Sequence, residues 1–132
     1  MAKLRHVAIR CDDLHWGAKF YSECFEMEEV GRVGNLDVAG AVYLSDGVMN
    51  VALIKVVPDY PNFKPDGLNH FGFVVNDVAK AVEKAKELGC IDIVDPAAAG
   101  GAGVTWEVKM KTPDGVAFDF TEHGWPGVGA LD

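Results

Sequence analysis

The two halves of the chain repeat one pattern. The segment His6-Val-Ala-Ile-Arg-Cys-Asp-Asp-Leu matches the segment His70-Phe-Gly-Phe-Val-Val-Asn-Asp-Val, which begins 64 positions later. Each half also ends in an Asp-Gly turn followed by an apolar segment, and the two turn glycines, Gly47 and Gly115, are 68 positions apart. A single copy of such a unit leaves one sheet face uncovered, so the two copies should pack as one domain. The repeat therefore predicts a pseudo-twofold arrangement with one histidine of each copy near the axis.

The apolar spacing predicts the same order of elements in both halves, a strand, a helix and three strands. Asp12-Asp13 and Asn76-Asp77 are expected to cap the two helices. The expected fold class is α+β, with tandem βαβββ modules whose eight strands curl into an open cup and whose helices lie outside. Strands are expected at 4–11, 30–38, 41–44, 48–57, 69–75, 91–94, 105–111 and 116–121, and helices at 14–26 and 78–88. The expected organisation is a single domain made of module 1 (about 3–57), a linker with three prolines (58–67), module 2 (68–123) and a short tail (124–132).

Composition narrows the possible partners. A net charge of −8 and a pI near 4.8 argue against nucleic acid and against an anionic membrane surface. No apolar run reaches the roughly 18–20 residues of a membrane-spanning helix, and the first residues lead into a strand, not a signal peptide. The three cysteines have no clustered spacing, which favours a reducing cytoplasm over structural disulfides. A small molecule is therefore the expected partner.

The tandem pattern, with the motifs that begin at His6 and Leu68 and the segment Thr112-Pro-Asp-Gly-Val-Ala-Phe-Asp-Phe, resembles the vicinal oxygen chelate superfamily. The resemblance covers about residues 3–122. This superfamily includes glyoxalase I, bleomycin-resistance proteins, extradiol ring-cleaving dioxygenases, fosfomycin-inactivating transferases and methylmalonyl-CoA epimerase. The resemblance implies two βαβββ modules around a divalent metal ion, often with the cup completed across a homodimer. Trp125, in the tail, is expected to cover the mouth of the pocket or to contact a second subunit.

The resemblance places His6 and His70 at metal-ligand positions. One histidine in an apolar strand is more often a core residue, but two at equivalent positions of a repeat favour ligation. The carboxylate is expected from Asp119, four residues after the turn glycine, because strand alternation should turn it into the cup with Phe118 facing the helices. Glu122 would reach the cup only through a bulge. A two-histidine, one-carboxylate set suits iron(II), manganese, nickel or zinc. The superfamily usually has Glu at the position of Asp119. The alternative for Asp119 is a hydrogen bond to the backbone at the end of its strand.

The ligand count bears on the reaction. The position expected to be equivalent in module 1, Val51, cannot ligate, whereas glyoxalase I and the epimerase normally have an acidic or amide residue there. The three remaining ligands are closer to those of the dioxygenases, so extradiol-dioxygenase-like chemistry on a substrate with vicinal oxygens is the first expectation. A glyoxalase-like lyase or isomerase is the alternative. A metal-free binding protein of the bleomycin-resistance type is a further alternative, favoured by Val51 and by the Asp at position 119.

Three charged residues are candidates for catalytic roles. Arg10 shares a strand face with His6, where a glutathione-using glyoxalase has an arginine against a substrate carboxylate; a salt bridge to Asp12 is the alternative. Lys109 lies near the place where extradiol dioxygenases tend to have a tyrosine, and its ammonium group could orient an anionic oxygen. Glu107 shares the face of Lys109, and the pair could also be two charges on a solvated strand.

Overall fold

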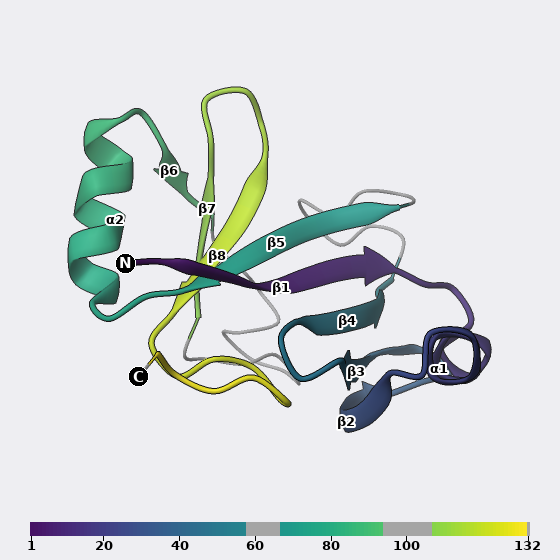
Figure 1. Ribbon diagram of the computed structural model, residues 1–132. Coiled ribbons are helices and arrows are strands. Elements are labelled where there is room, and N and C mark those ends of the chain that lie inside the picture. The colour runs from purple at the N-terminus through teal and green to yellow at the C-terminus, as the bar shows by residue number, and fades with distance from the viewer. Residues whose placement is uncertain (58–66, 94–106, 132) are drawn as a thin grey trace.

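The computed structural model describes residues 1–57, 67–93 and 107–131 (Figure 1). Within these ranges both halves show the expected order of one strand, one helix and three strands, which confirms the α+β fold class. The linker 58–66 and the loop 94–106, with Trp106, lie outside the described residues. The elements are β1 (Lys3–Arg10), α1 (Leu14–Cys24), β2 (Glu28–Asn35), β3 (Ala39–Ser45), β4 (Asn50–Lys55), β5 (Leu68–Val74), α2 (Val78–Glu87), β6 (Ile91–Asp92), β7 (Val108–Lys111) and β8 (Ala117–Thr121).

All the described strands belong to one eight-stranded sheet, in the order β2-β3-β4-β1-β5-β8-β7-β6. The first strands of the two modules, β1 and β5, are antiparallel neighbours at its centre, and each pairs in parallel with the last strand of its own module, β4 or β8. The pseudo-twofold axis therefore passes between β1 and β5. This arrangement brings His6 and His70 to the middle of the sheet, where His6 pairs with Gly72 and His70 with Ala8.

The helices begin at the expected caps. The side chains of Asp13 and Asp77 accept hydrogen bonds from the backbone N–H groups of Trp16 and Lys80, at 3.0 Å each. Helix α1 packs over β3 and β4, and α2 contacts β8. Under α1 lies an apolar cluster on one face of the sheet, made of Leu14, Ala18, Val42, Leu44 and Leu53. No helix in the described ranges is long and apolar enough to cross a membrane.

The predicted position of Val51 is wrong. Val51 packs against the apolar cluster under α1, and its neighbour Ala52 pairs with Ala8 on the other face. Strand β4 begins at Asn50 instead of 48. The carboxylate of Asp46 accepts hydrogen bonds from the backbone N–H groups of Val48 and Met49, at 2.9 and 2.7 Å, and holds both residues in the turn. The position equivalent to Asp119 is therefore Ala52, which is also unable to ligate a metal ion.

Candidate metal centre

Five neighbouring strands place one residue each along a line across the sheet. Register pairs Asn50 with His6, His6 with Gly72, Gly72 with Asp119, and Asp119 with Lys109. Paired residues on adjacent strands point to the same face, so these side chains gather on the face opposite α1. His70 lies on that face as well, because it pairs with Ala8, two residues after His6.

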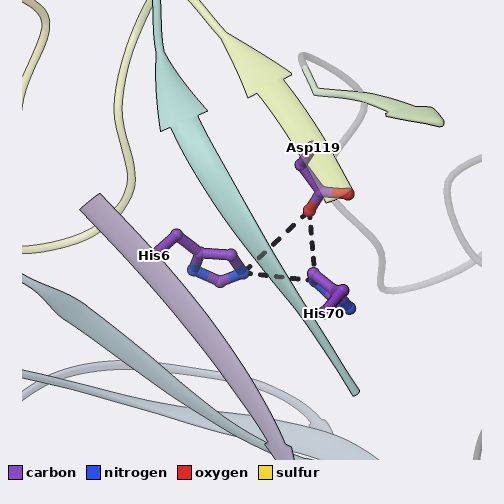
Figure 2. Close-up of side chains that lie close together, drawn as sticks. All are labelled: His6, His70 and Asp119. Atoms are coloured by element: carbon purple, nitrogen blue, oxygen red, sulfur yellow. Dashed lines mark hydrogen bonds and ion pairs between the residues drawn. The ribbon is translucent and has the colours of Figure 1, made fainter. Parts of the chain in front are cut away.

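His6, His70 and Asp119 converge from β1, β5 and β8 (Figure 2). The two Nε2 atoms are 3.3 Å apart, and Oδ2 of Asp119 is 3.1 Å from Nε2 of His70 and 4.0 Å from Nε2 of His6. The exposed fractions of the three side chains are only 3%, 8% and 1%. Among the described residues these form the only group of three or more His, Cys, Asp or Glu side chains whose possible ligand atoms all lie within 4.8 Å of one another. Two ligands at right angles around an ion at about 2.1 Å are roughly 3 Å apart, so the donor separations suit a divalent ion.

The amide of Asn50 determines which ring nitrogen of His6 carries the proton and which one faces the centre. Asn50 donates from Nδ2 to the backbone carbonyl of Pro126 at 2.9 Å, so its Oδ1 faces Nδ1 of His6 at 2.6 Å. Nδ1 of His6 must therefore carry the proton, and Nε2 directs a lone pair toward the centre. Oδ1 of Asn69 contacts Nδ1 of His70 in the same way, at 2.5 Å. Two imidazole lone pairs that face each other at 3.3 Å repel unless a cation or proton lies between them, which is the donor arrangement of a metal site.

Burial keeps His6 in the form that ligates metals. Burial first, and the neighbouring His70 second, lower the pKa of His6 to about 4, so that its ring is neutral near pH 7. The pKa of Glu107 is raised, chiefly by burial and then by the nearby Asp119. Burial also raises the pKa of Tyr43 to about 12, with Glu107 as the second cause. The centre is therefore a low-dielectric site with a carboxyl group that holds its proton more tightly than usual.

Lys109 and Glu107 lie at the centre, and the alternative of two charges on a solvated strand is wrong. Nζ of Lys109 is 3.0 Å from both oxygens of Asp119 and 3.4 Å from Nε2 of His70. It is also 3.6 Å from Oε1 of Glu107, and the exposed fractions of the two side chains are 17% and 9%. Both groups are therefore within reach of a molecule bound at the triad.

The tail closes one side of the centre with Trp125. Its indole stacks on the ring of His6, with centroids 4.4 Å apart and planes 7° apart, and its Nε1 donates to Oε2 of Glu107 at 2.8 Å. Trp125 and Val128 bond to each other across the turn at Pro126-Gly127, where Gly127 has a φ of 84°. These contacts match the expectation that Trp125 covers the site, and the expected contact with a second subunit stays a prediction.

Two other candidates lie elsewhere. The side chain of Arg10 pairs with Asp12, with Nη2 and Oδ1 2.9 Å apart, as in the salt-bridge alternative. Glu122 accepts a hydrogen bond from the N–H of Val78 at 2.8 Å, at the start of α2. Asp119, not Glu122, is therefore the carboxylate beside the histidines.

Sequence reasoning missed the two asparagines. Asn69 directly precedes His70, and this adjacency was the available signal. The contact between Asn50 and His6 joins residues 44 positions apart, and its amide is oriented by the tail. Only the register of β1 with β4 reveals it.

Comparison with known proteins assigns the family. Residues 3–120 match the model of the Glyoxalase/Bleomycin resistance protein/Dioxygenase superfamily. A "Probable lactoylglutathione lyase, chloroplastic" of Arabidopsis thaliana is 32% identical over 130 residues, which is 92% of this chain but only 36% of that protein. A hypothetical protein of Bacillus halodurans is similar in structure with a TM-score of 0.70 and 18% identity, over 90% of this chain and 92% of the other. A Streptomyces coelicolor methylmalonyl-CoA epimerase in complex with 2-nitronate-propionyl-CoA has a TM-score of 0.66 and 18% identity, over 89% and 92% of the two chains. The family model matches most of the chain and the fold agrees with it, so the chain belongs to the glyoxalase/bleomycin resistance protein/dioxygenase superfamily.

Proposed function

We propose that this protein is a metal-dependent enzyme that acts on a small molecule with oxygens on adjacent atoms. The observation that carries the proposal is the buried convergence of His6, His70 and Asp119, with two imidazole nitrogens and a carboxylate oxygen directed at one point. Iron(II), manganese, nickel and zinc all accept such a donor set. When bound, the ion would polarise the substrate oxygens and stabilise negative charge that develops on them.

The residues around the triad favour a proton-transfer reaction, as in a lyase or isomerase. Glu107 is buried and has a raised pKa, and a carboxyl group with these properties can accept and return a proton near neutral pH. The ammonium group of Lys109 would orient an anionic substrate oxygen, and Arg10 would bind a negatively charged group farther from the centre. The printed name of the Arabidopsis relative, a lactoylglutathione lyase, supports the same class.

Ring-cleaving dioxygenase chemistry is the second candidate. Its support is the ligand count: neither Ala52 nor Val51 can act as a fourth donor, and three protein ligands leave coordination positions for substrate and dioxygen.

All three donors of the proposed site come from one chain. The expected homodimer and cytoplasmic location stay predictions.

Metal analysis of anaerobically purified protein tests the proposal. We expect about one equivalent of a divalent metal in the wild type and none in His70→Ala. The matched control is His15→Ala, because His15 is exposed on α1 and pairs with Asp37 away from the triad. Absence of metal in all three proteins, even after incubation with each ion, would leave a metal-free binding protein.

Two assays on the metal-loaded protein separate the reaction classes. Appearance of the thioester absorbance in a mixture of glutathione and a 2-oxoaldehyde, which form a hemithioacetal, would support the lyase, and consumption of dioxygen with a catechol would support the dioxygenase. For the lyase we expect Glu107→Gln to lower kcat by about 100-fold or more at a metal concentration that saturates the site in both proteins, because the proton acceptor is lost. A Glu107→Gln variant with wild-type kcat would refute the role of Glu107.

A further inference from the structure

Lys109 brings a positive charge among the atoms that would ligate the metal ion. Its Nζ donates to both oxygens of Asp119 at 3.0 Å and lies 3.4 Å from Nε2 of His70. The ammonium group is thus hydrogen-bonded to the carboxylate that a divalent ion would need as a ligand. A divalent ion bound to Asp119 and the ammonium group of Lys109 would be two positive charges on one buried carboxylate, and they would repel each other. The ion and the ammonium group therefore compete for Asp119.

We propose that Lys109 is a tethered cation that neutralises Asp119 in the metal-free protein and moves to Glu107 when a divalent ion binds. This inference rests on the metal site of the proposed function and adds a means of setting its affinity. Oε1 of Glu107 is 3.6 Å from Nζ, so a small rotation of the lysine side chain completes the contact. The other oxygen of Glu107 is held by Nε1 of Trp125 at 2.8 Å, which keeps the carboxylate in place to receive the ammonium group.

In this arrangement the effect of Glu107 on the affinity for the metal ion depends on Lys109. With both residues present, the displaced ammonium group finds a partner, and the buried site gains no uncompensated positive charge. Without Glu107, the ion would have to displace Lys109 from Asp119 with no second carboxylate to receive its ammonium group, and binding of the ion would be weaker. Without Lys109, the ion would meet Asp119 directly, and Glu107 would matter little.

Calorimetric titration of metal-free protein with Ni²⁺ measures this coupling. The proteins are the wild type, Lys109→Met, Glu107→Gln, the double variant, and Lys84→Met as a control that removes one exposed lysine. We expect Lys109→Met to tighten binding about 10- to 100-fold, the equivalent of a lost hydrogen bond to a charged group. Glu107→Gln should weaken binding about tenfold in the wild type and change it less than about twofold in Lys109→Met. Lys84→Met should bind like the wild type. Lys109→Gln, which keeps a hydrogen-bond donor on a side chain one atom shorter but not the charge, should also bind more tightly, and thermal unfolding in chelator checks that each variant is folded.

The outcomes separate this inference from the proposed function. Equal affinity of the wild type, Lys109→Met and Lys109→Gln would refute the competition and leave the metal site intact. Binding by the lysine variants but not by the wild type would support the competition and refute metal dependence of the natural protein. Binding by none of the proteins would refute both. If Glu107→Gln weakens binding equally with and without Lys109, Glu107 acts through its own charge, and the movement of the lysine is refuted.

Discussion

Gly72 makes room for the indole of Trp125, and adding a single methyl group there should disturb the whole centre. A Cβ atom at position 72 would lie 2.6 Å from Cη2 and 2.8 Å from Cζ2 of Trp125, and 3.2 Å from Cβ of His6. Carbon atoms in contact are normally about 3.5–4.0 Å apart, so the ring must retreat by roughly 1 Å. The backbone φ of Gly72 is not in the left-handed region, so alanine itself would fit the strand.

The cost follows from what holds the indole. The ring is rigid, stacks on His6 and donates to Glu107, so it cannot turn aside without losing contacts. Overpacking costs about 1–3 kcal/mol, and a lost hydrogen bond to a charged acceptor about 1.5–3 kcal/mol. Replacing glycine by alanine returns about 0.4–1 kcal/mol through the unfolded chain. We therefore expect Gly72→Ala to lower the free energy of unfolding by about 1.5–5.5 kcal/mol.

Urea unfolding in chelator, followed by far-UV circular dichroism, measures this loss. Gly129→Ala is the matched control, because a Cβ there meets no atom within 4 Å, and it should change the free energy of unfolding by less than about 0.5 kcal/mol. In a Trp125→Ala background only the milder contact with Cβ of His6, at 3.2 Å, remains, and Gly72→Ala should cost less than about 1 kcal/mol. An equal destabilisation by Gly72→Ala with and without Trp125 would refute the steric argument.

Three further predictions concern the centre and its surroundings. Asn50→Leu removes the acceptor that holds Nδ1 of His6 and should lower the affinity for Ni²⁺ about 10- to 100-fold in a calorimetric titration; unchanged affinity would refute its role. Glu122→Ala should lower the stability by about 0.5–1 kcal/mol through the lost contact with Val78, and a loss of metal content would contradict the assignment of Asp119 as the ligand. In metal-free protein the pKa of His6 is near 4 in the folded state and near 6.5 in the unfolded state, so the unfolded state binds the proton first as the pH falls. Stability should therefore drop by on the order of 1 kcal/mol between about pH 7.5 and 5.5, and an unchanged drop in His6→Gln would show that another group causes it.

The repeat and strand alternation were enough to predict the part of the centre that lies within regular strands. The offset of 64 positions identified His6 and His70 as equivalent, and the structure places them at the central strand pair. Alternation along β8 separated Asp119 from Phe118, whose ring contacts Phe120 on the other face of that strand. These predictions succeeded because the period of two holds through an unbroken strand.

The rest of the centre depends on contacts that no local pattern encodes. The place of Glu107 depends on a hydrogen bond from Trp125, which comes from the tail and fits beside His6 only because Gly72 has no side chain. Counting four residues from the turn glycine failed in module 1, because the Asp46 carboxylate holds an additional residue in the turn. A shift of one residue moves a side chain to the opposite face, which is why Val51 was assigned to the wrong side of the sheet.

The two modules share a fold but contribute different chemistry to the centre. Module 1 supplies His6 and an amide, and its position equivalent to Asp119 is Ala52, in an apolar cluster with Ala8, Ala41 and Tyr43. Module 2 supplies the charged groups, Asp119, Lys109 and Glu107. A ligand between two identical modules could bind in either of two orientations related by the pseudo-twofold axis. The charges lie on one side of the axis, and the three alanines and Tyr43 lie on the other. We therefore expect a small molecule with a polar end and an apolar end to bind in one orientation only, with its oxygens toward β7 and β8.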